Sequence, residues 1–346
     1  MEKRKIKLVI WDLDNTIWRG VLSEDRDVTL ISGRRKMIET LDERGILQSI
    51  SSKNDYDSAY RKLKEYGLDE YFLYPKINWN PKSQNIKETI SQINISEDAV
   101  AFVDDQIFEL EEVKFSLPEV MVISADDIEG ILQEDCMNPI FITEDSKLRR
   151  NMYKDDIKRQ ELEKSFTGTK EEFLNTLHMR LKITIAAEED LKRVEELTVR
   201  THQMNSTGYT YSYEELRQMI QNERYLLWVV EMSDIYGNYG KIGIILIDCK
   251  QEKWILKLLI TSCRVVNRGI GLALLTMVVN KSIIAGKELL AEFAPTDRNR
   301  IMFVAYKMMG FQEIDEIDHV QILKYTSNKK HELPKYLEII DKTDKG

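Results

Sequence analysis

Cysteine and histidine are scarce in this chain, which has three cysteines and four histidines among 346 residues. The cysteines (Cys136, Cys249 and Cys263) are widely spaced and follow no metal-ligand pattern. Neither a disulfide framework nor a thiolate metal cluster is therefore expected. The low cysteine content predicts a reducing compartment, and we expect a cytoplasmic protein.

Long apolar runs and an excess of positive charge are also missing. The longest apolar stretches, residues 242–247 and 278–285, are too short to span a membrane. The basic start, residues 1–5, precedes an apolar stretch that is too short for a signal peptide. Lysine and arginine number 50 against 59 aspartates and glutamates, which gives a formal net charge of −9. An acidic chain is not attracted to nucleic acids or anionic membranes, so we expect neither as a partner.

The composition that remains is typical of a globular protein, with 42% hydrophobic and 32% charged residues. The length suggests two domains at about 150 residues each. The first third alternates strand and helix patterns, with strands expected at 6–11, 46–51, 71–74, 99–103 and 120–123 and helices at 34–44, 56–66 and 83–93. This order predicts an α/β fold, in which helices cover a parallel sheet.

The second half has its own order of elements. Strands are expected at 181–187, 225–232, 241–248, 254–262, 289–293 and 320–325, and helices at 188–201, 213–222, 269–285 and 298–309. We predict an α/β domain at residues 1–130, a charged helical linker at 131–180, a second α/β domain at 181–326 and a polar C-terminal tail at 327–346.

Carboxylates follow two of the buried strands in the first domain. Asp12 and Asp14 come directly after the first strand, and Asp104 and Asp105 end a later one. The carboxyl ends of parallel strands meet at one edge of a sheet, where ligands bind. Such a cluster of acids needs a cation, and oxygen ligands suit Mg²⁺. Single aspartates at strand ends are also ordinary turn formers, so the signal lies in the whole ordered set.

The chemistry that this cluster suggests is phosphoryl transfer. Asp12 is placed to attack phosphorus and form an aspartyl-phosphate. Asp14 is placed to protonate the leaving oxygen and later to activate water. Ser52 ends another strand and Lys82 follows a turn, so a hydroxyl and an ammonium are available to hold the phosphoryl oxygens.

These motifs, in this order, resemble those of the haloacid dehalogenase (HAD) superfamily of phosphotransferases, and more closely those of its FkbH-like subfamily. The stretches that carry the resemblance are WDLDNTIWRGVLSED (11–25), SSKND (51–55), NWNPK (78–82), FVDDQIFE (102–109), RTHQMN (200–205) and SCRV (262–265). The resemblance implies an enzyme that takes a glyceryl unit from 1,3-bisphosphoglycerate, a phosphorylated three-carbon substrate. It also implies removal of phosphate and loading of the glyceryl unit on an acyl carrier protein, for polyketide or related biosynthesis.

The resemblance also implies roles for individual residues. It assigns catalysis to Asp12 and Asp14. It further implies phosphate or substrate contacts from Thr16, Ser51, Ser52, Lys53, Asn54 and Lys82, and Mg²⁺ contacts from Asp12, Asp14 (through its backbone carbonyl), Asp104 and Asp105.

Two departures from the family pattern matter. Many members have a cysteine, associated with a glyceryl thioester, where this chain has Ser51. A serine hydroxyl without a base beside it is a much weaker nucleophile than a thiolate. Two alternatives to an acyl-enzyme therefore stay open. The glyceryl unit is transferred directly to the carrier thiol, or the protein is only a phosphatase. Arg19 replaces a usual glycine, and it either binds a substrate anion or lies exposed on the surface.

The short intervals between motifs leave no room for a large cap domain. About thirty-five residues separate Thr16 from Ser51, and the interval from Asp55 to Lys82 is also short. An uncapped site is open to a bulky acceptor, which favours a macromolecule such as a carrier protein.

A glycine-rich helix start marks the second domain. Residues 267–271 (NRGIG) follow a strand and open an apolar helix, and a later helix ends with FVAYKMMGF. With the order of strands, this resembles the GNAT acyltransferase fold, which binds coenzyme A at such a loop through backbone N–H groups. The resemblance implies coenzyme A-like or pantetheine contacts from Arg264, Arg268, Gly269 and Gly271. Alternatively, the glycines only give clearance for close packing. Val266 stands where GNAT loops usually have arginine or glutamine.

The sequence therefore leaves three alternative functions. The leading one is phosphoryl removal coupled to acyl loading, in which the second domain guides the pantetheine arm of the carrier. The second is a small-molecule phosphatase that uses the first domain alone. The third is a carrier-binding module whose catalytic site has decayed, and the intact set of Asp12, Asp14, Lys82 and Asp104 argues against it.

Overall fold

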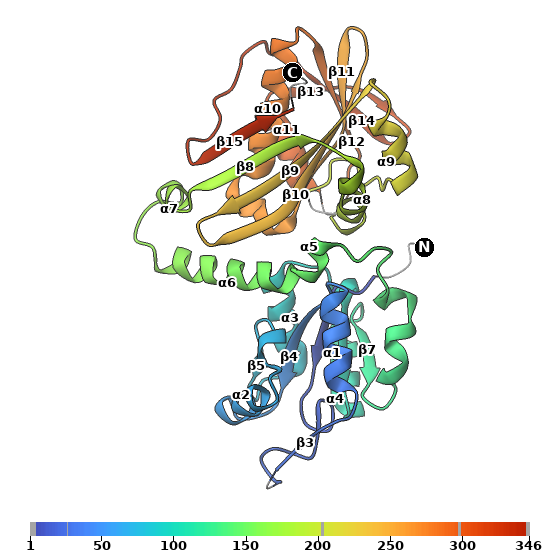
Figure 1. The fold of residues 1–346 in the computed structure, drawn as a ribbon, viewed down its shortest axis with the longest axis vertical. Coiled ribbons are helices and arrows are strands. Elements are labelled where there is room, and N and C mark those ends of the chain that lie inside the picture. Colours follow the sequence, from blue (N-terminus) through green and yellow to red (C-terminus); the bar gives the residue numbers. More distant parts are fainter. Residues whose placement is uncertain (1–4, 26, 202–203, 297–298, 344–346) are drawn as a thin grey trace. The chain divides into compact units, whose positions relative to one another are not determined.

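The computed structural model describes residues 5–25, 27–201, 204–296 and 299–343. The chain divides into two compact units, residues 1–154 and 155–346. Figure 1 shows a sheet with helices in each unit. Residues 131–154 belong to the first unit and residues 155–180 to the second, so the stretch predicted as a separate linker is shared between them.

The first unit contains a five-stranded, all-parallel sheet in the order β5-β4-β1-β6-β7. Its strands are β1 (Leu8–Trp11), β4 (Leu47–Ser52), β5 (Lys76–Ile77), β6 (Val100–Asp104) and β7 (Met121–Ser124). Strands β1, β4 and β6 are buried along their whole length, which explains why β1 is continuously apolar. β4 also carries Gln48 and three serines, and β6 is apolar up to Asp104.

Helices and a small hairpin complete this unit. The helices are α1 (Arg34–Glu43), α2 (Tyr56–Glu65), α3 (Lys82–Ile93), α4 (Ile107–Ser116), α5 (Glu144–Lys147) and the start of α6 (Arg149–Ser165). A two-stranded hairpin, β2 (Trp18–Arg19) with β3 (Thr29–Leu30), follows β1. The hairpin, α2, α3 and α4 all start at the carboxyl edge of the sheet, so the loops of that edge are short.

One strand of the first unit lies elsewhere than predicted. The sequence pattern places a strand at residues 71–74, whereas Tyr71 ends a short 3₁₀ turn and β5 begins at Lys76. Tyr74 has a left-handed backbone with φ of +48°, and Pro75 follows it. A left-handed residue breaks the extended conformation, so the strand starts only after it.

The second unit contains an eight-stranded sheet in the order β13-β14-β12-β11-β10-β9-β8-β15. Its strands are β8 (Met179–Ile185), β9 (Tyr225–Asp234), β10 (Gly237–Cys249), β11 (Lys253–Thr261), β12 (Glu288–Phe293), β13 (Phe311–Ile317), β14 (Val320–Tyr325) and β15 (Leu337–Lys342). The β11–β12 and β8–β15 pairs are parallel and the other pairs are antiparallel.

Apolar clusters cover both faces of this sheet. Along β10, Ile245 and Ile247 belong to one cluster, and Ile244 and Leu246 belong to the other. The helices that supply the covering residues are α7 (Lys170–Thr176), α8 (Leu191–Arg200), α9 (Tyr213–Ile220), α10 (Ile270–Ile284) and α11 (Arg300–Met308). The unit is thus a sheet between two layers of helices.

Two strands of this unit are absent from the sequence-based expectation. β13 is almost fully exposed and rich in acids, so it lacks the apolar alternation of a half-buried strand. β15 lies in the stretch predicted to be a polar tail, where it pairs in parallel with β8. Such pairing with a strand about 150 residues earlier gives no local signal, and only Leu337 of β15 is buried.

Candidate active site

Three neighbouring parallel strands bring the predicted site residues of the first unit to one edge. The register pairs Trp11 of β1 with Val103 of β6 and with Ile50 of β4. The backbone N–H of Asp12 also donates to the carbonyl of Val103 at 2.9 Å. Asp12, Ser52 and Asp104 therefore end their strands at the same level, as the sequence predicts.

Lys82 lies at the centre of this edge. It is the first residue of α3 and is buried. Its Nζ lies 2.7 Å from Oδ1 of Asp12 and 2.5 Å from Oδ2 of Asp104. The ammonium of Lys82 thus holds two carboxylates together, and its predicted contact with phosphate stays a prediction.

Burial and charge shift the pKa values of these groups. Burial raises the pKa of Asp12 to about 7, although Lys82 acts in the opposite direction. Burial also raises the pKa of Asp104 and, with the nearby Asp104 charge, that of Asp105. For Lys82, burial lowers the pKa, but the two carboxylates outweigh burial and the pKa lies above its usual value. Burial thus disfavours the ionised form of all three carboxyl groups, and Lys82 offsets this effect only in part.

The donor set fits a divalent cation. One carboxylate oxygen each of Asp12, Asp104 and Asp105 lie within 4.8 Å of one another. Asp105 Oδ1 is buried and has no hydrogen-bond partner among the described residues. Three carboxylates and one ammonium leave two negative charges, which a divalent ion with a preference for oxygen would balance. We therefore regard Asp12, Asp104 and Asp105 as the residues that would hold Mg²⁺.

The carboxylate of Asp14 lies outside this oxygen cluster. Its Oδ1 accepts hydrogen bonds from Trp18 Nε1 at 2.7 Å and from the Leu22 N–H at 3.2 Å, and its Oδ2 accepts one from Asn54 Nδ2 at 2.9 Å. A metal contact of Asp14 through its backbone carbonyl stays a prediction.

The other residues predicted to contact phosphate have different hydrogen-bond partners in the structure. Asn54 is buried and donates to Ser52 Oγ at 3.3 Å as well as to Asp14. Thr16 and Ser51 are buried, and their hydroxyls have no hydrogen-bond partner in the described part of the chain. Lys53 pairs with Glu109 at 2.6 Å, and its predicted phosphate contact stays a prediction.

Sequence reasoning missed two residues that hold this edge together. Trp18 is fully buried and bonds to Asp14. Arg34, also buried, donates from Nε to the Thr16 carbonyl and from Nη2 to the Ala125 carbonyl, both at 2.8 Å. Trp18 lies within the motif quoted above, whereas a single arginine in a helix gives no signal of this kind.

The glycine-rich loop belongs to the second unit. Gly269 has a φ of +73°, and a Cβ there would lie 2.6 Å from the hydroxyl oxygen of Tyr336. A Cβ on Gly271 would lie 2.7 Å from Cε of Met204. Arg268 is buried, and Arg264 donates from Nη2 to the Tyr239 carbonyl at 2.8 Å.

The chain also fills the space beside this loop. β11 and β12 pair only where Lys253–Leu256 lies beside Glu288–Ala291. Beyond these pairs, the Thr261 N–H donates to the Met204 carbonyl at 3.0 Å, and the Ala294 N–H donates to the Ser206 carbonyl at 3.1 Å. A segment of the RTHQMN motif, whose residues 202–203 are outside the described part, thus lies between the two strands.

Tyr336 and Met204 therefore occupy the space in which a side chain at Gly269 or at Gly271 would lie. The pantetheine contacts of Arg264, Arg268, Gly269 and Gly271 stay a prediction.

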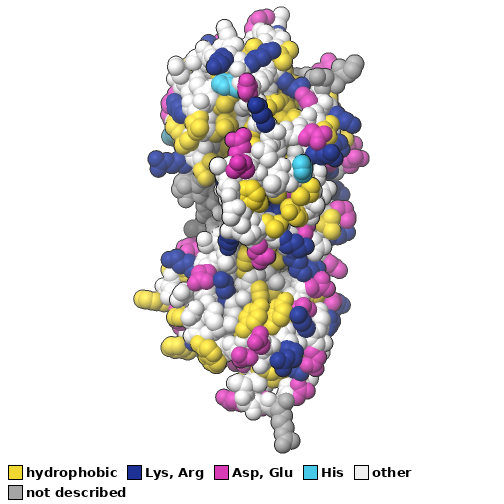
Figure 2. All heavy atoms as spheres, turned by 90° about the vertical axis from the view of Figure 1, so that its left-hand side faces the viewer, with side chains coloured by type: hydrophobic (Ala, Val, Ile, Leu, Met, Phe, Trp, Pro, Cys, Tyr) yellow, Lys and Arg dark blue, Asp and Glu magenta, His cyan; other side chains and the backbone are white. Residues whose placement is uncertain are grey.

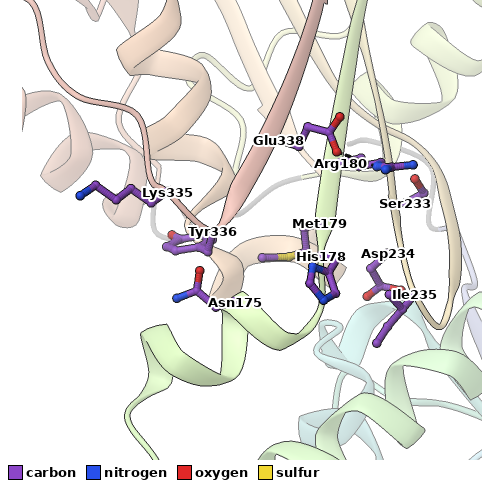
Figure 3. Close-up of a pocket in the computed structure, with 10 residues that line it drawn as sticks. All are labelled: Asn175, His178, Met179, Arg180, Ser233, Asp234, Ile235, Lys335, Tyr336 and Glu338. Atoms are coloured by element: carbon purple, nitrogen blue, oxygen red, sulfur yellow. Dashed lines mark hydrogen bonds and ion pairs between the residues drawn. The ribbon is translucent and has the colours of Figure 1, made fainter.

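A groove of about 750 Å³ lies elsewhere in the second unit, at the ends of α7, β8 and β9 and at the start of β15. Figure 3 shows the Lys335 and Arg180 side chains directed to opposite sides of it. Arg180 pairs with Glu338 at 2.7 Å, and Asp234 pairs with Arg159 at 2.7 Å. Arg180 and Asp234 are therefore each paired with an opposite charge, and the Lys335 and Arg180 side chains do not converge on a common point.

The surface charge and the length of the helices are relevant to the expectation that nucleic acids and membranes are not partners. On the face shown in Figure 2, basic side chains are interspersed with acidic ones over each unit. Within the ranges that the structure describes, the longest apolar helices are all too short or too polar to cross a bilayer. The absence of nucleic-acid and membrane partners stays a prediction.

Comparison with protein families adds independent information on the first unit. Residues 18–115 match the model of the haloacid dehalogenase-like hydrolase family. The match covers less than half of the chain. It includes Ser52, Lys82 and Asp104 and begins after Asp12 and Asp14.

Comparison with solved structures gives weak likenesses to each unit separately. The N-terminal part of the protein BF1531 from Bacteroides fragilis, containing a phosphatase domain complexed with Mg, is 25% identical over 40% of this chain and 42% of that chain, with a TM-score of 0.37. The ribosomal-protein-S18-alanine N-acetyltransferase from Escherichia coli is 16% identical over 42% of this chain and 95% of that chain, with a TM-score of 0.34. The PaiA N-acetyltransferase from Thermoplasma acidophilum, in complex with coenzyme A, is 18% identical over 42% of this chain and 99% of that chain, with a TM-score of 0.34.

These structural likenesses are too weak to transfer an activity, and this chain spans 42% of the length of the Bacteroides fragilis chain. No curated protein matches the sequence.

The family match and the parallel sheet characterise the first unit. It has a Rossmann-like parallel sheet, and its residues 18–115 match the model of the haloacid dehalogenase-like hydrolase family. The second unit is an α/β domain with helices on both faces of a mixed sheet. The predicted fold class is confirmed.

Proposed function

We propose that this protein is a Mg²⁺-dependent phosphatase and glyceryltransferase that acts on 1,3-bisphosphoglycerate and loads a glyceryl unit on an acyl carrier protein. The observation that carries the phosphoryl part is the convergence of Asp12, Asp104 and Asp105 on one point, with Lys82 bonded to two of them. Turn-forming aspartates have no reason to meet in this way, because clustered buried carboxylates repel one another.

Asp12, Asp14 and Lys82 have separate roles in the proposed phosphoryl transfer. A carboxylate oxygen of Asp12 attacks phosphorus, the bond from phosphorus to the leaving oxygen breaks, and Asp14 supplies the proton that this oxygen takes. Water then attacks the aspartyl-phosphate, Asp14 takes the proton of that water, and the bond from phosphorus to Asp12 breaks. Lys82 is placed to stabilise the charge on the phosphoryl oxygens.

Mg²⁺ held by Asp12, Asp104 and Asp105 would neutralise the charge of the phosphoryl group as the nucleophile approaches. Without that neutralisation, a carboxylate and a phosphate dianion repel each other. Burial raises the pKa values of Asp12 and Asp104, which supports the need for a cation that stabilises their ionised forms.

The acyl part of the proposal depends on the sequence resemblance. In this proposal the carrier thiol attacks the C1 carbonyl of 1,3-bisphosphoglycerate and displaces inorganic phosphate, while Asp12 takes the C3 phosphoryl group. Ser51 is buried, and its hydroxyl has no hydrogen-bond partner among the described residues. Because no base activates it there, direct transfer to the carrier thiol is favoured over an acyl-serine.

The decisive experiment is intact-mass spectrometry of candidate holo-carrier proteins after incubation with this protein, Mg²⁺ and 1,3-bisphosphoglycerate. A glyceryl mass increment that depends on Asp12 supports the proposal, with Asp12→Asn as the control. Phosphate release without any increment supports instead a small-molecule phosphatase. That second function is favoured by one observation, which is that every group of the carboxylate cluster lies in the first unit. No phosphate release in either assay would rule out both.

A further inference from the structure

The carboxylate of Asp14 is held from two sides of the site. Trp18 Nε1 (2.7 Å) and the Leu22 N–H (3.2 Å) donate to Oδ1, and Asn54 Nδ2 (2.9 Å) donates to Oδ2. Trp18 and Leu22 belong to the segment of the β2–β3 hairpin, whereas Asn54 follows β4. Donors on both oxygens restrict rotation of the carboxylate, because each hydrogen bond requires its own direction.

Both side-chain donors are themselves fixed in place. Trp18 is fully buried, its backbone pairs with Leu30 of β3, and its ring contacts the ring of Tyr66 with centroids 6.4 Å apart. Asn54 is 4% exposed and also donates to Ser52 Oγ at 3.3 Å. A buried side chain with packed neighbours has few alternative rotamers, so each donor keeps the Asp14 carboxylate in one position.

We propose that Trp18 and Asn54 are positioning residues for Asp14, and that Trp18 thereby couples the β2–β3 hairpin to the proton-transfer step. This inference rests on the proposed function, in which Asp14 exchanges protons with the leaving group and with water. Trp18 touches neither the phosphoryl group nor the metal ligands in this scheme. Its indole N–H acts only through the carboxylate of Asp14.

The test separates the two chemical steps. With p-nitrophenyl phosphate and Mg²⁺, the nitrophenolate leaves without needing a proton, so transfer of the phosphoryl group to Asp12 depends little on Asp14. Hydrolysis of the aspartyl-phosphate still needs Asp14 to take a proton from water. A misplaced Asp14 therefore slows the second step selectively, and the phosphorylated enzyme accumulates.

Trp18→Phe removes the N–H donor and keeps a buried aromatic ring. We expect a burst of nitrophenolate close to one equivalent of enzyme, followed by turnover about 10-fold to 100-fold slower than in the wild type. Trp11→Phe is the matched control, because Trp11 is equally buried but its Nε1 donates to Gln48 Oε1 at 3.1 Å. The control is expected to show wild-type turnover per folded molecule and no added burst.

A purely structural role of Trp18 would lower the burst and the turnover in the same proportion, and that result would overturn the inference. So would equal behaviour of Trp18→Phe and Trp11→Phe.

A second measurement is independent of activity. Urea unfolding of Trp18→Phe, Asp14→Ala and the double variant forms a thermodynamic cycle. We expect non-additive losses of stability, because either single change already removes the same hydrogen bond. Additive losses would overturn the inference even if the enzyme is active. Conversely, the stability losses of the variants could be non-additive while the wild-type protein hydrolyses no phosphate ester. That result would count against the proposed function and not against the contact between Trp18 and Asp14.

Discussion

The ammonium of Lys82 lies 2.7 Å from Oδ1 of Asp12, so the proposed nucleophile is ion-paired within the protein itself. Both side chains are buried. Lys82 also bonds to Asp104 at 2.5 Å. One ammonium therefore holds together two carboxylates that come from strands ending more than ninety residues apart in sequence.

Lys82→Met is expected to slow phosphate release by about 100-fold or more, because a group that stabilises phosphoryl charge is lost. Removing the ammonium also leaves the carboxylates uncompensated, so the Mg²⁺-induced rise in the unfolding temperature is expected to exceed that of the wild type. Phosphate assays and thermal unfolding with EDTA or Mg²⁺ measure both effects.

Lys76→Met provides the control for this experiment, since Lys76 forms an ion pair with Glu88 at 3.0 Å in the same unit but outside the cluster. It is expected to change activity by less than about 2-fold, because a surface ion pair contributes little. Equal losses in the two variants would contradict the role of Lys82.

The pKa of Asp12 makes the stability of the metal-free protein dependent on pH. Burial raises this pKa from 3.8 to about 7, so the folded state binds the proton more tightly than the unfolded state. The stabilising contribution is complete below about pH 4 and is lost as the pH rises through 7. We expect the unfolding temperature in EDTA to fall over this range, and Mg²⁺ to raise it more at pH 8 than at pH 5.

Asp12→Asn serves as the control for the pH experiment, because the amide does not titrate. In that variant the fall in stability between about pH 4 and pH 7 and the benefit from Mg²⁺ are both expected to shrink. An Mg²⁺ effect of the same size at pH 5 and pH 8 in the wild type would contradict a proton-coupled metal site.

Arg34 fixes the loop after β1 to the end of β7 through the carbonyls of Thr16 and Ala125. Arg34→Ala is expected to lower the free energy of unfolding of the first unit by about 2–3 kcal/mol, because it removes charged donors from two buried acceptors. Urea unfolding measures the loss. Arg61→Ala, a change at an exposed position of α2, is expected to stay within about 0.5 kcal/mol, and a similar loss in both variants would refute the role of Arg34.

Gly269→Ala is expected to destabilise the second unit by more than the cost of a left-handed alanine, which is about 1–2 kcal/mol. The excess arises because the new Cβ would lie 2.6 Å from the Tyr336 hydroxyl oxygen. Gly286→Ala isolates the backbone cost, since Gly286 has a φ of +63° and open space around its Cβ position. In a Tyr336→Phe background the excess is expected to disappear; if it persists, the close approach is not its cause.

Truncation after Tyr336 removes β15 and tests whether the C-terminal stretch is a folded strand. Loss of the buried Leu337 alone is expected to cost about 1.5–3 kcal/mol. The Lys281–Asp341 ion pair at 2.7 Å is lost as well. Differential scanning calorimetry of the full chain and of a chain ending at Thr343 provides the comparison. Equal unfolding temperatures of all three chains would show that β15 contributes nothing.

The amino-acid sequence was sufficient to locate most of the elements, with β5, β13 and β15 as exceptions, and the strand ends that carry Asp12 and Asp104. The apolar run of β1 followed by Asp12 predicts a buried strand with an acid at its end, and the same reasoning places Asp104. These signals are local, because a strand buried on both faces must be apolar and a charge can follow only where the strand leaves the core. The resemblance in the motifs then supplies roles that the pattern alone leaves open.

The contacts of each acid depend on the direction of its side chain and, in most cases, on residues distant in sequence, which no local pattern reveals. Asp14 has the same residue type and nearly the same position as Asp12, yet its carboxylate is turned to Trp18 and Asn54 and lies outside the cation cluster. The strand β15 and the closeness of Tyr336 to Gly269 likewise depend on pairing across more than sixty residues. Side-chain direction and long-range pairing are set by packing in the folded chain, and this is why they required three-dimensional coordinates.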